Sequence, residues 1–433
     1  MMNNCVDELL INRIQESLKE IVKELRLSYN FSGILKEKKD REKRRSELMG
    51  VIEGLLLDVV RSVAEDRPPA LTLRDHSDWN NVMFQHCLQP RPGGESSTLQ
   101  VNFGASRSRA KFSLLVHLLG VVHRLLLTGA SCTRRQLYYQ NVALVRSQRV
   151  LDAAMRDVCC LLAAPAWDLG VGATSKGLVA GPLLLCMEDG DVIDCSTPGG
   201  VLVPQQVHTV TRLESSARFV LLVEKDATFQ KLLDEGALRR LGPCILVTGK
   251  GYPDVATRLL VKLLWQSLGI PVLALVDADP HGIEIMCVYR FGSLSMSQQA
   301  GDLAVPAVRW LGVHPTDISR LGIKAQPLSA SDSNKLRSLS ARPYINGSAL
   351  QLQVFNANFL ETHIISKSYV LPVPHFLSSF FAGRDAEGQG RRSCVAALIS
   401  GGRKAEIEGV AEFSATYLTD AYIPNKICCR ELL

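Results

Sequence analysis

Two arginines and two tyrosines share one short segment of the chain, and their chemistry suits an attack on phosphate. They are Arg134, Arg135, Tyr138 and Tyr139. A phenol becomes a good nucleophile when it loses its proton, and neighbouring cations favour the ionised form. Arginine also binds phosphate oxygens in a bidentate manner, so the segment could both hold and attack a phosphodiester. The segment alone equally allows tyrosines that pack in a core or touch a nucleic acid without reacting.

Three acidic residues follow apolar runs that are typical of buried strands. Glu224 comes directly after residues 219–223, and Asp277 and Asp279 come after residues 272–276. Continuous apolar runs separated by helix-like stretches indicate a parallel sheet covered on both faces, which binds ligands beyond the carboxyl ends of its strands. Carboxylate oxygens there suit Mg²⁺, which also bridges to phosphate. The alternative is that these acids simply end strands in exposed turns.

Glycine-containing turns support a site at that edge of the sheet. Pro280, His281 and Gly282 form a tight turn directly after Asp279, and Gly249-Lys250-Gly251 follows a third apolar run at residues 244–247. The second turn would bring main-chain N–H groups and a cation to the acids. Neither a P-loop nor a Rossmann glycine fingerprint is present, so the usual nucleotide-binding folds are not indicated.

Composition narrows the class of protein without naming a function. A chain of 433 residues can hold two or three domains, and a net charge of +6 permits a nucleic-acid partner without requiring one. The 12 cysteines include no Cys-x-x-Cys pair, and the start of the chain has no signal-peptide pattern, so we expect an intracellular protein with reduced thiols. Residues 112–127 are apolar but carry His117, His123 and Arg124, which predicts a buried helix and no membrane contact.

The first half of the chain is predicted to be mainly helical. The first 30 residues form an amphipathic helix that either packs in a domain or docks a partner, and the charged run 36–45 is read as a solvated helix face or linker, with a DNA contact or nuclear import signal as the alternative. Helices are expected at residues 48–64, 111–129, from Thr133 onward and at 148–162. Short strands at 178–185 and 201–203 follow them. Three helices followed by a hairpin are typical of a winged helix.

Five motifs, taken in order, resemble the topoisomerase VI A-subunit family. They occupy residues 135–139, 174–181, 223–226, 248–254 and 276–282. Within that family the chain looks most similar to the eukaryotic, vertebrate-type meiotic transesterase that makes the double-strand breaks starting recombination. The resemblance covers roughly residues 47–344 and 404–426. The resemblance depends on the order of the five motifs, because each motif alone is a weak signal.

The resemblance implies an α/β multidomain fold, in which a CAP-like winged-helix DNA-binding domain precedes a Toprim domain with a parallel sheet. It implies that Tyr139 attacks DNA beside Arg135, and that Glu224, Asp277 and Asp279 hold Mg²⁺. The expected DNA contacts are Arg134, Lys176, Lys250, Tyr252 and Arg258. The expected divisions are a helical, charged extension at 1–46, a winged-helix domain at 47–205, a Toprim domain at 206–344, a disordered insertion at 345–403 and a further Toprim part at 404–433.

The resemblance also implies partners and a location. Members bind double-stranded DNA as homodimers in which the tyrosine of one protomer completes the metal site of the other, and each protomer stays linked to a 5′ end. They act with a topoisomerase VI B-like subunit, together with other meiotic break-forming factors, in the nucleus on meiotic chromosomes. Gln136 departs from the family pattern because an acidic residue usually follows the motif arginine. Residues 36–45 and 345–402 have no recognised family counterpart, and either a splice variant or a gene-model error would explain the second stretch.

Two other functions stay open at this point. A Toprim nuclease or primase would use the same three carboxylates without Tyr139 and would leave no protein on the DNA. A DNA-binding isoform or scaffold with an inactive site would bind DNA without cutting it.

Overall fold

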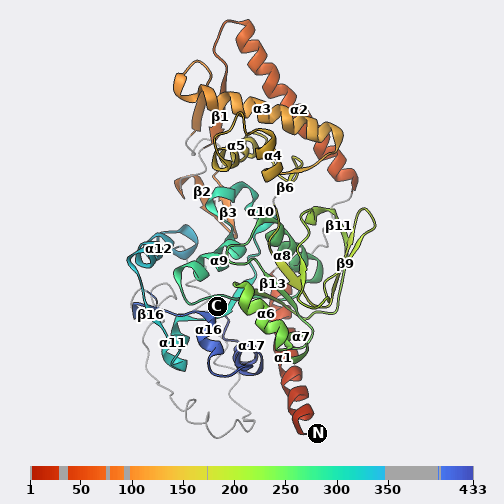
Figure 1. Ribbon diagram of the computed structural model, residues 1–433, viewed down its shortest axis with the longest axis vertical. Helices are drawn as coiled ribbons and strands as arrows, with labels where there is room; N and C mark the ends of the chain where they lie inside the picture. Colours follow the sequence, from red (N-terminus) through yellow and green to blue (C-terminus); the bar gives the residue numbers. More distant parts are fainter. Residues whose placement is uncertain are drawn as a thin grey trace.

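Two stacked bodies make up the protein in the computed structural model, which describes residues 2–28, 38–74, 79–91, 98–172, 174–346, 398 and 401–432. Each body has its own hydrophobic core, and Figure 1 shows them arranged along the long axis of the molecule. The upper core draws on residues 48–171. The lower core draws on the first helix, residues 82–88 and most of the chain from residue 179 onward. Two separate cores in one chain mean two domains.

The upper body is mainly helical, as its sequence predicted. Helix α3 runs through its centre and ends at Gly129, whose φ of 69° is the left-handed conformation that glycine adopts most easily. Helix α4 then begins at the Thr133 cap. The helices are α2 (Lys38–Ala64), α3 (Ser106–Thr128), α4 (Arg134–Gln140) and α5 (Gln148–Leu161). The strands are the antiparallel pair β1 (Ala70–Arg74) and β4 (Thr98–Asn102), and the parallel pair β5 (Cys132–Thr133) and β6 (Val171–Gly172).

Helix α3 is long and apolar enough to cross a membrane by length and composition alone. Its inward residues, which include Leu115, Leu118 and Val122, are fully buried in the upper core, and α3 contacts α2 and α5. The expected buried helix is therefore what the structure contains.

The lower body is built on a six-stranded mixed sheet. Its order is β10-β7-β13-β12-β14-β15, and the last four strands are parallel. Strands β12, β13 and β14 are buried along their whole length, which explains their continuous apolar sequences. The strands are β7 (Leu178–Ala180), β10 (Val201–Leu202), β12 (Val220–Val223), β13 (Ile245–Thr248), β14 (Val272–Leu275) and β15 (Val308–Gly312).

Helices and small sheets surround this sheet. The helices are α6 (Asp226–Asp234), α7 (Ala237–Arg240), α8 (Val255–Leu268), α9 (Pro280–Phe291), α10 (Ala300–Leu303), α11 (Pro315–Leu321), α12 (Ala330–Ser340) and α13 (Pro343–Asn346). Short helical turns are η1 (Trp79–Asn81), η2 (Val207–Thr209) and η3 (Leu294–Gln299). Smaller sheets contain β2 (Val82–Phe84) with β3 (Leu88–Pro90), and β8 (Leu183–Met187) with β9 (Val192–Asp194) and β11 (Val210–Ser215).

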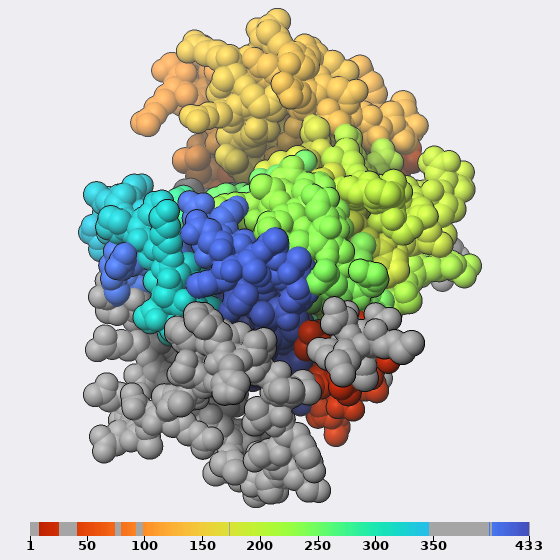
Figure 2. Space-filling view, turned by 60° about the horizontal axis from the view of Figure 1, so that its bottom comes forward, coloured from red at the N-terminus to blue at the C-terminus, as the bar shows by residue number. Residues whose placement is uncertain are grey.

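Both ends of the chain pack on the lower body. Helix α1 (Met2–Ser28) buries Ile14, Leu18 and Ile21 in the lower core and contacts α17, so it packs within the chain. The C-terminal elements are β17 (Arg403–Lys404), which pairs with β16 (Gln326–Pro327), and α16 (Ile407–Ala411), η4 (Leu418–Tyr422) and α17 (Ile423–Cys428). Figure 2 shows this blue segment lying between green and cyan parts of the lower body. Most of the expected insertion at 345–403 lies outside the described residues.

The expected domain boundary at residue 205 does not match the two cores. The upper core ends at Val171, and strand β7 already belongs to the sheet of the lower body. Strand β7 pairs antiparallel with β13, and β8 pairs with β11, so the strands assigned to a wing pack in the lower body. The prediction that these strands form a wing was wrong. Their partners, β11 and β13, come later in the chain, and such pairing leaves no local signal in the sequence.

The described part of the charged run 36–45 braces the two bodies. Arg41 on α2 forms an ion pair with Glu188 at 3.0 Å and donates to the carbonyl of His208 at 3.3 Å, both in the lower body. Arg45 donates to the carbonyl of Leu127 at 2.9 Å, at the end of α3 in the upper body. The prediction of a solvated face or linker is therefore wrong for these two arginines. Arg41 binds the lower body and Arg45 binds the upper body, so this part of α2 connects the two bodies.

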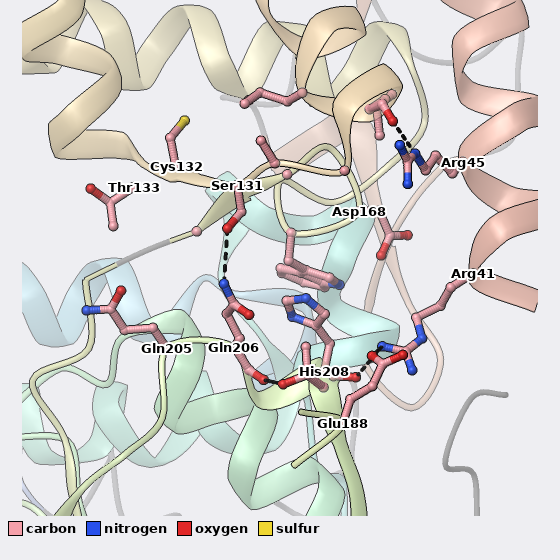
Figure 3. Close-up of a pocket in the computed structure, with 18 of the residues that line it drawn as sticks. Arg41, Arg45, Ser131, Cys132, Thr133, Asp168, Glu188, Gln205, Gln206 and His208 are labelled. Carbon is pink, nitrogen blue, oxygen red and sulfur yellow. Dashed lines mark hydrogen bonds and ion pairs between the residues drawn. The ribbon is translucent and has the colours of Figure 1, made fainter. Parts of the chain in front are cut away.

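A cavity of about 740 Å³ lies at this joint. Figure 3 shows the cavity between Arg41 and Arg45 on one side and Thr133, at the start of α4, on the other. The side-chain amide of Gln206 donates a hydrogen bond to Oγ of Ser131 at 3.0 Å. Thr133 and Gln136, the capping residues of α4, also line the cavity. The position of α4 is therefore tied to the joint between the bodies.

Candidate active site

The carboxyl edge of the sheet joins Glu224 to Asp277. Glu224 follows β12, Asp277 comes two residues after β14, and these strands pair in parallel. The main-chain N–H of Asp277 donates to Oε2 of Glu224 at 2.8 Å. Only 8% of Glu224 and 4% of Asp277 is exposed. The two acids lie together, as their positions after parallel strands predicted.

Burial and mutual repulsion disfavour the charged forms of these acids. Burial raises the pKa of Glu224, and the charge of Asp277 raises it further. Burial also raises the pKa of Asp277, although the N–H of Ile407 and the ammonium of Lys225 oppose that rise. Two carboxylates that share a buried edge repel each other when both are ionised. A bound cation would remove that repulsion.

Asp279 lies at the same edge but also starts a helix. Its Oδ1 accepts a hydrogen bond from the N–H of Gly282 at 2.6 Å, which caps α9. A Cβ at Gly282 would lie 2.3 Å from the carbonyl oxygen of Asp277, so only glycine lets the helix begin this close to the strand end. The turn after Asp279 therefore fixes both aspartates, as the sequence suggested.

The C-terminal segment closes this edge from outside the sheet. Ala405 pairs antiparallel with Ala278, and the N–H of Ile407 donates to Oδ1 of Asp277 at 2.9 Å. The ammonium of Lys225 lies 3.0 Å from Oδ2 of Asp277, and it also contacts two glutamates of this segment. The contacts are 2.9 Å to Oε2 of Glu406 and 2.8 Å to Oε2 of Glu408.

Three residues of the site, Lys225, Glu406 and Glu408, were not predicted from the sequence. Lys225 stands beside a candidate ligand in the Val-Glu-Lys-Asp motif, which was a usable signal. Glu406 and Glu408 carry no local signal, because they reach the site through pairing with residues about 130 positions earlier in the chain.

The donor set fits a hard divalent ion once Lys225 moves aside. Among the described residues, no three His, Cys, Asp or Glu side chains already converge as metal ligands. One oxygen of each acid is taken by a main-chain N–H, which leaves Oε1 of Glu224 and the Oδ2 atoms of Asp277 and Asp279. Of these three oxygens, Oδ2 of Asp277 contacts Lys225. Carboxylate oxygens gathered at one edge are suitable ligands for Mg²⁺.

The glycine-containing loop after β13 lies beside Glu224. The N–H of Gly251 donates to the main-chain oxygen of Glu224 at 2.8 Å. Lys250 pairs with Asp226 at 3.0 Å, and the ammonium of Lys176 donates to the carbonyl of Lys250 at 3.2 Å. Two of the expected DNA contacts, Lys176 and Lys250, are thus neighbours at the edge that carries the acids.

Tyr252 lies in the same loop and is 40% exposed. Its hydroxyl donates to Glu284 and lies 3.2 Å from Nδ1 of His281. Glu284 also pairs with Lys335 and Arg342. Burial raises the pKa of Glu284, but these three partners outweigh it and hold that pKa at about 2. The ring of Tyr252 is therefore positioned by a charged anchor while part of it stays open to solvent.

Arg258 differs from the other expected DNA contacts because it is buried. It is 2% exposed on α8, and its Nη1 contacts the sulfur of Met296 at 3.9 Å. Burial lowers its pKa to about 10. A DNA phosphate at the surface cannot reach this guanidinium in the described structure, so the expected contact is not supported. Arg258 shares a helical face with the buried Val261 and Trp265, and this spacing could have predicted its burial.

Helix α4 presents Tyr139 outward. Tyr139 is 63% exposed, whereas Tyr138 packs against the upper core. Thr133 and Gln136 form a capping box, in which Gln136 Oε1 accepts from the N–H of Thr133 at 2.8 Å and its own N–H donates to Thr133 Oγ1 at 3.1 Å. Gln136 therefore caps the helix although it departs from the family pattern, because an amide oxygen can accept the same hydrogen bond as a carboxylate.

The two arginines of this segment have different surroundings. Arg135 is exposed and makes no hydrogen bond or ion pair with the described residues. Arg134 is half-buried, and its Nε has no partner among the residues that the structure describes. Figure 1 places α4 in the upper body and the acidic edge, marked by α6 and α16, in the lower one. Tyr139 makes no contact with Glu224, Asp277 or Asp279 among the described interactions.

Two protein-family models match the chain. The model for the Toprim domain of the topoisomerase 6 A-subunit and Spo11 proteins matches residues 219–363, and the described part of this range lies in the lower body. The model "Type IIB DNA topoisomerase" matches residues 110–171, in the upper body. The first match extends to residue 363, so the expectation that the stretch from residue 345 has no family counterpart was wrong for its first part. Both bodies therefore carry independent family signals.

Comparisons with individual proteins agree with these matches. The chain is 37% identical to meiotic recombination protein SPO11 of Homo sapiens over 386 residues, which covers 88% of this chain and 87% of the relative. It is 40% identical to meiotic recombination protein W68 of Drosophila melanogaster over 333 residues, covering 76% and 86%. It is 31% identical to the A subunit of DNA topoisomerase 6 from Arabidopsis thaliana over 338 residues, covering 77% and 69%.

Proposed function

Since the chain belongs to the Spo11 and topoisomerase VI A-subunit family, we propose that it makes meiotic DNA double-strand breaks by transesterification. The hydroxyl oxygen of Tyr139 attacks a backbone phosphorus. The bond to the 3′ oxygen breaks, that oxygen takes up a proton, and the 5′ phosphate stays on the tyrosine. One phosphodiester replaces another, so the step itself needs no ATP.

The exposed position of Tyr139 carries this proposal. A solvent-facing tyrosine on a capped helix, beside an Arg135 cation that no described residue pairs with, can reach a DNA strand without rearrangement of the core. Arg135 is proposed to bind the phosphate under attack, and the upper body to act as a DNA-binding domain of winged-helix type. Arg134, Lys176, Lys250 and Tyr252 are proposed to contact the flanking DNA.

Glu224, Asp277 and Asp279 are proposed to hold Mg²⁺ at the edge of the Toprim domain. The bound ion supplies positive charge that stabilises the developing negative charge on phosphate. Within one copy, Tyr139 makes no described contact with these acids, and the resemblance implies a homodimer, so the proposed centre forms between two copies of the chain, each supplying one half. Double-stranded DNA, a topoisomerase VI B-like protein and other break-forming factors are the proposed partners, on meiotic chromosomes in the nucleus.

A covalent-adduct assay tests this proposal. The full chain, co-expressed with its B-like partner, is incubated with Mg²⁺ and duplex DNA labelled at its 3′ ends and is then denatured. We expect label to stay with wild-type protein and to be lost with Tyr139→Phe, while DNA binding changes by no more than a few fold. Tyr138→Phe is the matched control and should keep the adduct.

The competing functions give different results in the same assay. A Toprim nuclease would cut DNA in the Tyr139→Phe variant and leave no label on the protein. An inactive DNA-binding isoform would bind labelled DNA without cutting it. Placing the label on the opposite end of the cleaved strand checks that the protein is joined to the 5′ side of the break.

A further inference from the structure

We propose that Lys225 is a tethered cation that leaves Asp277 for Glu406 and Glu408 when a divalent ion binds, so that the C-terminal segment sets the metal affinity of the Toprim edge. This inference rests on the proposed function, because it takes Glu224, Asp277 and Asp279 as the metal ligands. It assigns a part in metal binding to a lysine and two glutamates outside that set.

The ammonium of Lys225 is shared among three carboxylates. It lies 3.0 Å from Asp277, 2.9 Å from Glu406 and 2.8 Å from Glu408. The side chain of Asp277 is 5% exposed, whereas those of Glu406 and Glu408 are 60% and 45% exposed. Lys225 therefore has one buried partner and two outer partners, and it can lose the first while keeping the others.

A metal ion and Lys225 compete for the same oxygen. Oδ1 of Asp277 accepts from the N–H of Ile407, and Oδ2 is the atom that Lys225 contacts. Mg²⁺ binds carboxylate oxygens at about 2.0–2.1 Å, and an ammonium held on that oxygen would repel it strongly. Binding of the ion therefore requires that Lys225 withdraw from Oδ2.

The C-terminal segment is placed to accept the displaced lysine. Glu406 and Glu408 flank Ile407, whose N–H fixes the other oxygen of Asp277. Three consecutive residues thus orient Asp277 and hold an alternative site for its cation. Without these glutamates, the ammonium would keep only Asp277 as a close partner among the described residues and would compete more strongly with the ion.

Binding of Mn²⁺ to the full chain without DNA tests the inference, with free Mn²⁺ measured by electron paramagnetic resonance. We expect Lys225→Met to tighten Mn²⁺ binding about tenfold, since one positive charge leaves the site. Lys225→Arg should stay close to wild type. The double variant Glu406→Gln with Glu408→Gln should weaken binding several-fold in the wild-type background and have little effect in the Lys225→Met background.

Lys231→Met is the matched control. Lys231 lies on α6 and reaches the same C-terminal segment, donating to the carbonyl of Ala415 at 3.0 Å, but it contacts none of the proposed ligands. It should leave Mn²⁺ binding unchanged.

Three outcomes would overturn the inference. An unchanged dissociation constant for Lys225→Met would show that no competition exists. Equal weakening by the paired glutamine substitutions in both backgrounds would show that the glutamates act only through their charge. Finally, if Asp277→Asn binds Mn²⁺ like wild type, the metal site itself is misassigned and the proposed function loses its metal centre as well.

Discussion

The N–H of Asp277 donates to Oε2 of Glu224 at 2.8 Å, so two buried acids are joined across the ends of neighbouring parallel strands. The hydrogen bond orients Glu224 but does not neutralise it. The two acids therefore repel each other in the metal-free protein when both are ionised, and a divalent ion would remove that repulsion.

The metal-free protein should lose stability as pH rises from about 5 to 8. Burial and Asp277 raise the folded-state pKa of Glu224 above its unfolded value, so the folded protein holds the proton more tightly. That stability is fully present below the unfolded pKa and is lost as pH rises through the folded pKa. Glu224→Gln should reduce the loss by on the order of 1–3 kcal/mol.

Thermal unfolding in a chelating buffer at several pH values measures this effect. Glu214→Gln removes an exposed carboxylate from β11 and serves as the control. Identical pH slopes for wild type and Glu224→Gln would show that the buried acid does not carry the effect.

Gly282→Ala should disturb the metal edge and the fold together. The new Cβ would lie 2.3 Å from the carbonyl oxygen of Asp277, which would push the first turn of α9 away from the strand end. We expect a loss of about 1–3 kcal/mol in unfolding free energy and weaker Mn²⁺ binding. Gly54→Ala, at an open helix position, should instead be neutral or stabilise by up to about 1 kcal/mol. Equal melting temperatures for the two variants would refute the steric argument.

Asp317→Asn should destabilise the lower body strongly. Asp317 is 1% exposed and pairs with the buried Lys426 at 2.9 Å, and it accepts a hydrogen bond from Tyr422 at 2.7 Å. Removing its charge leaves the ammonium of Lys426 buried with less compensation, which costs about 3–5 kcal/mol.

Chemical denaturation checks this value, and limited proteolysis should show earlier cleavage of the segment from residue 403. Asp420→Asn breaks an exposed pair with Arg240 and should cost no more than about 1 kcal/mol. A similar cost for both substitutions would mean that the buried pair does not anchor the C-terminal segment.

Gln136→Ala should loosen the helix that carries Tyr139. It removes the side chain that accepts from the N–H of Thr133, at a cost of about 0.5–1 kcal/mol in helix stability. Gln136→Glu keeps an acceptor at that position and should behave like wild type. Hydrogen exchange of α4 and the yield of covalent adduct measure the difference, and equal values for the two variants would exclude a role for this cap.

The local elements and the acidic edge could be predicted from the sequence because their signals are local. The buried strands β12, β13 and β14 are continuous apolar runs, and Glu224 and Asp277 follow two of them. The Thr133 cap and the Gly129 helix end were likewise readable from residue type.

The missed features depend on residues that are distant in sequence. Strand β7 joins β13 across more than 60 residues, so residues 178–203 looked like a wing of the upper body. Arg41 was read as part of a solvated run, yet it pairs with Glu188 in the other body. The role proposed for Lys225 depends on its ion pair with Glu406, which lies far away in the sequence. In each case the pairing is tertiary, and composition or periodicity cannot specify it.

The antiparallel bridge between Ala278 and Ala405 bears on how mutant alleles should be classified. A stop codon or frameshift between codons 280 and 403 would leave a chain with Tyr139 and all three acids. That chain would lack the N–H group that orients Asp277 and both glutamates that draw on Lys225. Such alleles damage the centre directly, and geneticists should not score them as the loss of a dispensable tail.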